Sequence, residues 1–253
     1  MDIKQAVGKY NDSLGHLGHR LCPKAVLFDM DGVLYDSMPH HAIAWEKAMR
    51  LNGITMTPAD AYATEGARGI DTIRLFARQQ LGRNLSEAEA QAIYDEKTQI
   101  FHSMGDAPIF DGVTDIMARI RQARLSIAIV TGSGQRPLIR RLVNDFGAYL
   151  NEEHIVTAYD VSRGKPNPDP YLKGLERLGG LHPWEGIVVE NAPLGVRAGV
   201  AAGCFTVAVN SGPLPDSALT GEGAHLLFPS MRSFCDHFHD LLLAVETAPS
   251  TEK

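Results

Sequence analysis

The sequence predicts an α/β protein in which a parallel sheet is interrupted by an inserted, all-helical cap. Short apolar runs of strand length alternate with amphipathic helical stretches along most of the chain, which is typical of a parallel sheet covered by helices. Residues 38 to 105 contain no such apolar run. Polar side chains directly follow three of the predicted strands, and in such sheets ligands bind at the carboxyl ends of strands.

The composition is that of an ordinary folded protein. The chain has 253 residues, of which 44% are hydrophobic and 21% are charged, so it suits one large domain or a domain with an insertion. The net charge of −6 makes nucleic acid or an anionic membrane surface an unexpected partner. No apolar run approaches the roughly 20 residues of a membrane span.

The cysteines and the first residues favour a cytoplasmic protein. Cys22, Cys204 and Cys235 show no paired spacing, so each is expected to be a small apolar residue in a reducing compartment. The first 20 residues lack the unbroken apolar stretch of a signal peptide. We expect a monomer.

The predicted elements follow the alternation in chain order. Apolar residues recur at helical spacing from Met38 to Met49, and Gly53 ends that helix. Ser86 and Glu89 predict a capping box at the start of another helix. Further helices are predicted at 71–81, 87–104, 113–123, 137–146, 170–178, 196–202 and 231–245, and strands at 25–28, 125–130, 154–158, 186–189, 205–209 and 224–227.

This reading divides the chain into three parts. Residues 23–37 and 107–253 are expected to form a Rossmann-like core, with residues 38–106 as the cap. Residues 1–22 have weak periodicity and are predicted to be a loosely attached extension. His16 and His19 in that extension could form a metal pair, but solvent-exposed histidines are the better interpretation.

The first predicted strand ends in two carboxylates. Asp29 and Asp31 follow the apolar run 25–28, and Gly32 comes next. Carboxylates at the end of a buried strand are costly unless a cation is bound there. A calcium loop also has this spacing, but Tyr35 and His40 stand where oxygen ligands and the closing glutamate would be.

Three more polar clusters have the residue types that phosphoryl transfer needs. Thr131 to Gly134 offers a hydroxyl and backbone N–H groups at a glycine-rich turn. Lys165, next to Pro166, can neutralise phosphate charge, and Glu190 with Asn191 can supply oxygens for Mg²⁺. Singly, each could be a turn, a solvated lysine or a helix cap. Together they predict one carboxylate as nucleophile and a second as proton donor and acceptor.

These four clusters resemble the signature motifs of the haloacid dehalogenase-like (HAD) superfamily. The resemblance covers roughly residues 24 to 245, and segments 36–41 and 44–45 are similar to the first cap segment of the β-phosphoglucomutase-like subfamily. The motifs are Asp29-x-Asp31-Gly-Val, Thr131-Gly-Ser, Lys165-Pro and Glu190-Asn191-x-x-x-Gly195.

The resemblance implies a role for each motif. Asp29 would be the nucleophile that forms an aspartyl-phosphate, and Asp31 the general acid/base. Mg²⁺ would lie between Asp29, the Asp31 carbonyl and the fourth motif, which offers Glu190 or Asn191. The phosphoryl group would be held by Thr131, Gly132, Ser133 and Lys165.

Two departures from the family pattern bear on function. The fourth motif usually has two adjacent acids, whereas here the second is Asn191, which adds no charge. The cap loop of a mutase carries a Lys-Gly pair and a following arginine for a distal phosphate. Here Glu65 stands at the lysine position, and the arginine is displaced to Arg68. We expect Glu65 to reach the metal when the cap closes, unless it is a solvated cap glutamate.

We therefore predict a Mg²⁺-dependent phosphohydrolase that acts on a small phosphorylated substrate. The surroundings of Glu65 also resemble a branch of inorganic pyrophosphatases, which makes pyrophosphate the best single substrate. The alternatives are a β-phosphoglucomutase, a sugar-phosphate phosphatase and a non-catalytic phosphate-binding regulator. His41, near the cap hinge, either gates Asp31 or packs between helices.

Overall fold

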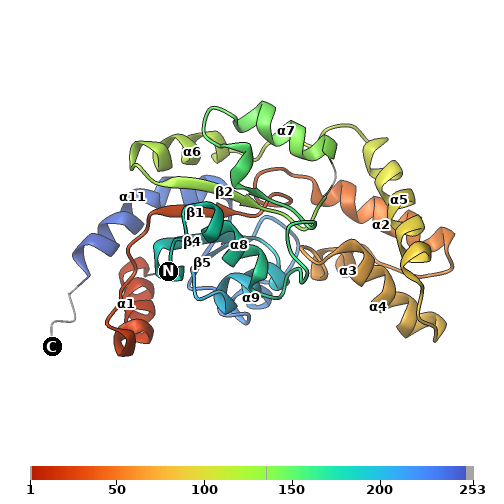
Figure 1. Cartoon of the computed structure of the whole chain (residues 1–253), viewed down its shortest axis with the longest axis horizontal. Coiled ribbons are helices and arrows are strands. Elements are labelled where there is room, and N and C mark those ends of the chain that lie inside the picture. Colours follow the sequence, from red (N-terminus) through yellow and green to blue (C-terminus); the bar gives the residue numbers. More distant parts are fainter. Residues whose placement is uncertain (1, 135, 249–253) are drawn as a thin grey trace.

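A parallel sheet forms the centre of the molecule (Figure 1). The computed structural model describes residues 2–134 and 136–248. In that part of the chain the strand order is β3-β2-β1-β4-β5-β6, and every pair is parallel. The strands are β1 (Ala25–Phe28), β2 (Ser126–Val130), β3 (Ile155–Val156), β4 (Gly186–Glu190), β5 (Phe205–Val209) and β6 (Leu226–Phe228).

Helices cover both faces of this sheet, so the predicted Rossmann-like class is confirmed. In Figure 1, α6 and α7 lie above the sheet, and α8 and α9 lie below it. The helices of the core are α6 (Val113–Gln122), α7 (Arg136–Phe146), α8 (Asp169–Arg177), α9 (Pro193–Ala201), α10 (Asp216–Thr220) and α11 (Met231–Thr247).

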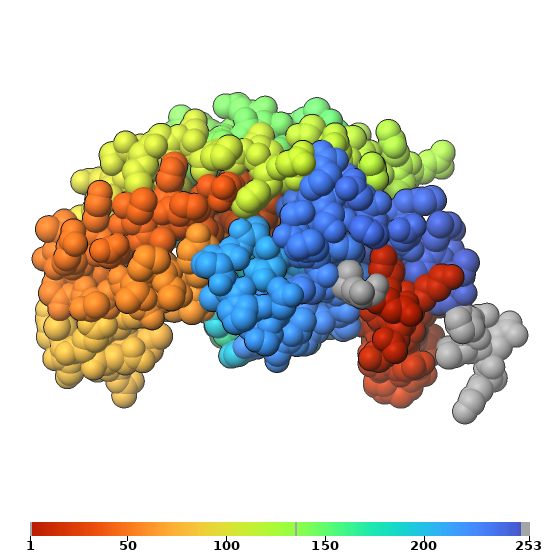
Figure 2. Space-filling model, turned by 180° about the vertical axis from the view of Figure 1, so that it is seen from behind, coloured from red at the N-terminus to blue at the C-terminus, as the bar shows by residue number. Residues whose placement is uncertain are grey.

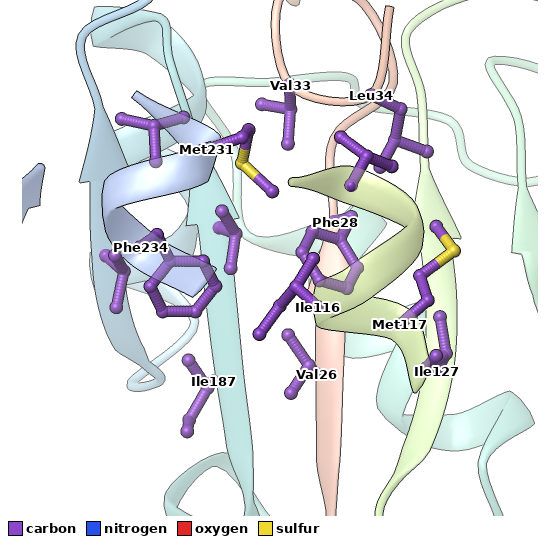
Figure 3. Close-up of a cluster of buried hydrophobic side chains, with 14 of the residues drawn as sticks. Val26, Phe28, Val33, Leu34, Ile116, Met117, Ile127, Ile187, Met231 and Phe234 are labelled. Carbon is purple, nitrogen blue, oxygen red and sulfur yellow. The ribbon is translucent and has the colours of Figure 1, made fainter. Parts of the chain in front are cut away.

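The alternation of side chains along β1 produces two separate cores, because successive residues of a strand point to opposite faces. Val26 and Phe28 pack with Ile116 of α6 and Phe234 of α11, as Figure 3 shows. Ala25 and Leu27 belong instead to the cluster beneath α8 and α9. Burial on both faces explains why β1 is apolar throughout and why its first polar residue marks its end.

The inserted segment is a helical cap with its own apolar core. It consists of α2 (Met38–Leu51), α3 (Pro58–Ala63), α4 (Gly69–Leu81) and α5 (Glu87–His102). These helices bury Trp45, Ile73 and Ile93 among themselves, at the end of the molecule away from the chain termini (Figure 1). The predicted capping box at Ser86 and Glu89 is present.

The expectation of a loosely attached N-terminal extension was wrong. Residues Ile3–Leu14 form helix α1, which lies beside α11 (Figures 1 and 2). Val7 and Tyr10 are buried in the main core, and the Tyr10 hydroxyl donates to the Gly203 carbonyl at 2.6 Å. Ile3, Ala6, Val7, Tyr10 and Leu14 pack on the main core and recur at helical spacing, a signal that the sequence analysis missed. His19 stacks on Trp184 at 3.9 Å between ring centroids.

Smaller differences concern element ends. The strands expected at 154–158 and 224–227 are shorter or shifted, and the short helices α3 and α10 were not predicted. These elements lie at sheet edges or span less than two turns, where periodicity carries little information.

Candidate active site

The sheet register brings the predicted clusters together. Asp29 directly follows β1, Thr131 directly follows β2, and Glu190 is the last residue of β4. Since β1 lies between β2 and β4, with Phe28 paired to both Ile129 and Val189, all three polar groups share one edge of the sheet.

Lys165 is the buried cation of this edge. Its ammonium donates to Asp29 Oδ1 at 2.5 Å, to Glu190 Oε1 at 2.6 Å and to the Val130 carbonyl at 3.0 Å. Burial alone would lower the pKa of Lys165, but the two carboxylates raise it above the ordinary value for lysine. Burial also raises the pKa of Asp29 to about 7, although Lys165 opposes this rise. An ionised Asp29 therefore needs positive charge nearby.

Glu190 is fully engaged by protein donors. Its Oε1 accepts from Lys165 and from the Tyr171 hydroxyl at 2.7 Å, and its Oε2 accepts from the Asn191 backbone N–H at 3.0 Å. A Cβ at Gly195 would lie 1.8 Å from Glu190 Oε1, which explains the glycine of the fourth motif. The sequence analysis missed Tyr171, which stands on the apolar face of α8 and gave no separate signal.

Glu65 of the cap meets Asn191 of the core. The Asn191 Nδ2 amide donates to Glu65 Oε1 at 2.8 Å, and Glu65 is buried. Burial, together with the carboxylates of Asp29 and Glu190, raises the pKa of Glu65 well above its usual range. Gly32 lies between these two side chains at a φ of +75°, and a Cβ there would lie 1.9 Å from Asn191 Nδ2. Asn191 Oδ1 is buried and has no hydrogen-bond partner within the described residues.

Asp31 faces a buried His41–Lys97 pair on the cap side. The Ser37 hydroxyl donates to Asp31 Oδ1 at 2.6 Å, and His41 Nε2 lies 3.2 Å from the same oxygen. An ammonium can only donate, so His41 Nδ1, 2.6 Å from Lys97 Nζ, must accept, and Nε2 then carries the proton that faces Asp31. Burial alone would raise the pKa of Asp31, but His41, Ser37 and Lys97 together lower it.

Lys97 is a site residue that the sequence analysis missed. It is 2% exposed in α5, and its ammonium lies 5.1 Å from the ring centroids of Trp45 and Phe101. Burial lowers its pKa to about 8, and burial with Lys97 nearby lowers the pKa of His41. A signal existed, because Lys97 shares the inward stripe of Ala90, Ile93 and Phe101, and a lysine there must be paired.

The cap closes over a small cavity at this edge of the sheet. The cavity holds about 60 Å³, room for about four to six water molecules at 10–15 Å³ each. The Thr131 hydroxyl accepts from the Ser133 backbone N–H at 3.0 Å and fixes the turn beneath it. The walls of the cavity include Asp29, Asp31, His41, Glu65, Lys97, Thr131, Gly132 and Ser133.

Arg68 does not line this cavity, although Ala67 and Gly69 on either side of it do. Its guanidinium donates instead to the Ser162 carbonyl of the core at 3.0 Å. The structure thus brings together all the other residues predicted for phosphate, metal or proton transfer and directs Arg68 elsewhere.

The oxygens at this edge suit a hard cation. In the described ranges 2–134 and 136–248, no group of three His, Cys, Asp or Glu side chains could hold a metal. The unpartnered Asn191 Oδ1 supplies the further oxygen that such a group lacks, and amide and carboxylate oxygens are ligands for Mg²⁺. The donor set therefore fits a divalent cation once the amide is counted.

A sequence model of the haloacid dehalogenase-like hydrolases matches residues 23–203. The chain belongs to this family. The resemblance found in the four motifs is thereby confirmed, and the chain is a HAD hydrolase with relatives that are named phosphatases.

Proteins similar to this HAD chain differ in substrate. Hexitol phosphatase A of Escherichia coli (strain K12) is 36% identical over 188 residues, which cover 74% of this chain and 83% of that protein. Beta-phosphoglucomutase of Bacillus subtilis (strain 168) is 27% identical over 202 residues, 75% of this chain and 84% of that protein. A solved structure from Bacteroides vulgatus, provisionally named a beta-phosphoglucomutase, is 44% identical with a TM-score of 0.91 and covers 97% of this chain and 98% of its own.

Among the residues that the structure describes, no helix is both long enough and apolar enough to cross a bilayer.

Proposed function

We propose that this HAD hydrolase is a Mg²⁺-dependent phosphohydrolase whose preferred substrate is inorganic pyrophosphate. The observation that supports the proposal is the hydrogen bond that the Asn191 amide donates to the buried Glu65 carboxylate. The Oδ1 atom of the same amide has no partner among the described residues. A carboxylate in such surroundings is costly unless a cation balances it. A glutamate at this place would repel a bare distal phosphate, whereas it suits a small anion that carries its own metal.

The proposed metal ligands are Asp29, the Asp31 carbonyl and Asn191, with Glu65 added when the cap closes. We assign this role to Asn191 rather than Glu190, because both carboxylate oxygens of Glu190 already accept hydrogen bonds from protein groups. When bound, Mg²⁺ would neutralise phosphate charge and favour the ionised form of Asp29.

The proposed mechanism uses the two aspartates in turn. A carboxylate oxygen of Asp29 attacks phosphorus, the bond to the leaving phosphate breaks, and an aspartyl-phosphate forms. Asp31 then takes a proton from water as that water attacks phosphorus, the bond between phosphorus and Asp29 breaks, and phosphate is released. The lowered pKa of Asp31 suits this base role, and a phosphate leaving group needs less protonation than a sugar alkoxide. Lys165 would hold the phosphoryl oxygens together with Thr131.

The small cavity of about 60 Å³ favours the smaller of the candidate substrates over a hexose that carries a phosphate. We also propose a cytoplasmic location, since Cys22, Cys204 and Cys235 are free thiols. We propose separately that the protein is a monomer.

A sugar-phosphate phosphatase is the second candidate, because a hexitol phosphatase is 36% identical to this chain. A mutase is the third. It would require the phosphoryl group on Asp29 to pass to a sugar hydroxyl rather than to water, with Asp31 taking the proton of that hydroxyl.

A phosphate-release assay separates these functions. Pyrophosphate, a hexitol 6-phosphate, and β-glucose 1-phosphate with a bisphosphate primer are compared with and without Mg²⁺. We expect the highest kcat/KM for pyrophosphate, with loss of turnover when Mg²⁺ is removed. Faster release from the hexitol phosphate, or conversion of β-glucose 1-phosphate to its 6-phosphate, would contradict the proposal.

A further inference from the structure

The segment 64–68 of the cap is where cap and core meet. Gly66 comes so close to the core that a Cβ on Gly132 would lie 2.8 Å from the Gly66 carbonyl oxygen. A Cβ on Gly66 itself would lie 3.1 Å from Lys165 Cδ. The cap also touches the segment after β5, as the contact between orange and blue in Figure 2 shows. In that segment a Cβ on Gly212 would lie 3.1 Å from the ring of Tyr62 in the cap.

Arg68 belongs to the segment 64–68, and its side chain points away from the cavity. Its Nη1 donates to the Ser162 carbonyl at 3.0 Å across 94 residues of sequence. Its aliphatic stem lies on Gly164, because a Cβ on Gly164 would lie 2.7 Å from Arg68 Cγ. The absent side chain of Gly164 thus leaves the space that the stem occupies.

The loop that receives Arg68 is also the loop that carries Lys165. Ser162 and Gly164 lie just before Lys165, and the Asn167 side-chain amide donates to the Gly164 carbonyl at 2.9 Å. Closure of the cap and placement of the buried ammonium therefore involve the same backbone.

We infer that Arg68 is a positioning residue that latches the cap onto the 162–165 loop and so keeps substrates larger than a diphosphate out of the cavity. The latch depends only on the contacts of Arg68. Its effect on substrate choice rests on the proposed function. A hydrogen bond from a charged donor at a partly exposed site changes an equilibrium by about tenfold, so we expect a change of that size in the fraction of closed molecules.

The chain offers a direct test of the latch. Cys22 is exposed on the core while Cys204 and Cys235 are buried, so spin labels on Cys22 and on Gln79→Cys in α4 report the distance between core and cap. The labelled full-length protein is compared with Arg68→Ala and Arg68→Lys. Arg78→Ala is the matched control, because Arg78 is an exposed arginine within α4, the helix that Arg68 precedes.

The second measurement is selectivity. The ratio of kcat/KM for pyrophosphate to kcat/KM for a hexitol 6-phosphate is obtained for each variant in Mg²⁺. We expect Arg68→Ala to populate longer distances and to lower this ratio about tenfold, Arg68→Lys to recover part of both, and Arg78→Ala to match the wild type.

Each other outcome has a defined meaning. Unchanged distances in Arg68→Ala would overturn the latch, even if affinity for pyrophosphate fell, because Arg68 would then contact substrate instead. Longer distances with an unchanged ratio would overturn the exclusion of larger substrates. If the wild type does not hydrolyse pyrophosphate but Arg68→Ala still opens, the proposed substrate fails and the latch stands.

Discussion

The two walls of the cavity hold their charged groups in different ways. On the core wall, Lys165 is bonded to Asp29 and Glu190, and every oxygen of Glu190 has a donor. On the cap wall, burial raises the pKa of Glu65 and lowers that of Lys97, so neither charge is fully balanced by the protein. The core wall thus carries its own cation, although the pKa of Asp29 is still raised to about 7, whereas the Glu65 carboxylate of the cap wall is bonded to the neutral Asn191 amide.

This difference separates chemistry from substrate choice. In the proposed mechanism, the core wall offers a nucleophile, a cation and a phosphate-binding turn, which any phosphate ester could use. The cap wall brings a carboxylate where the mutase pattern has a lysine, which under the proposed function favours a metal-bearing small anion. Relatives of this chain that are named for different substrates are consistent with such a division.

The largest effect is expected when the proposed nucleophile on the core wall is removed. Asp29→Asn keeps the size of the side chain but removes its nucleophilic carboxylate, so turnover should fall by about four orders of magnitude or more. Phosphate release with Mg²⁺ and pyrophosphate measures it, with circular dichroism as the control for folding. Retention of more than about one part in a hundred of the activity would refute the assignment of Asp29.

The buried ion pairs of Lys165 on the core wall predict a large stability effect at this residue. Lys165→Met leaves the buried carboxylates of Asp29 and Glu190 without their cation, and the free energy of unfolding should fall by about 3–5 kcal/mol. Urea denaturation at neutral pH measures this. Lys173→Met, in which a partly exposed pair is lost, should cost less than about 1 kcal/mol. Equal effects of the two variants would show that the buried triad is not what stabilises this wall.

The Glu65 carboxylate of the cap wall is expected to matter more for pyrophosphate than for sugar phosphates. Glu65→Gln should lower kcat/KM for pyrophosphate about a hundredfold and raise the Mg²⁺ concentration needed for half-maximal activity. Glu65→Lys should have at least this effect and favour glucose 1-phosphate in relative terms. Glu87→Gln, at an exposed cap glutamate, is the control. Unchanged pyrophosphate turnover in both Glu65 variants would exclude the metal role.

The smallest expected effect is on the pH dependence of stability. The pKa of Lys97 is about 8 when folded against 10.5 as its ordinary value, so between these pH values the unfolded chain binds more protons than the folded one. The contribution of Lys97 to stability should therefore rise with pH across this window, and Lys97→Met should remove about 2 kcal/mol of that rise relative to the wild type.

Urea denaturation at pH 7 and pH 10 measures the difference. Lys47→Met, at an exposed lysine of α2, should leave the rise unchanged. If Lys97→Met also leaves it unchanged, Lys97 is not a buried ammonium at neutral pH.

The sequence predicted the site residues of the core wall more completely than those of the cap wall. The four motifs stand directly after strands or in a loop stiffened by prolines, and the parallel register places strand ends side by side. Lys97 and Tyr171 were missed because they lie in helices whose local pattern is otherwise that of a buried face. Helix α1 was underestimated although Ile3, Ala6, Val7, Tyr10 and Leu14 recur at helical spacing and pack on the core.

By itself, the sequence determined the fold class, the family and the identity of the groups at the sheet edge, because these depend on local periodicity and on residues that adjoin their strands. The tertiary structure alone decided which partners those groups have. It paired Glu65 with Asn191 across 126 residues, His41 with Lys97 across 56, and Arg68 with the core instead of the cavity. Such contacts depend on how the packed cap meets the sheet, and spacing along the chain does not specify that geometry.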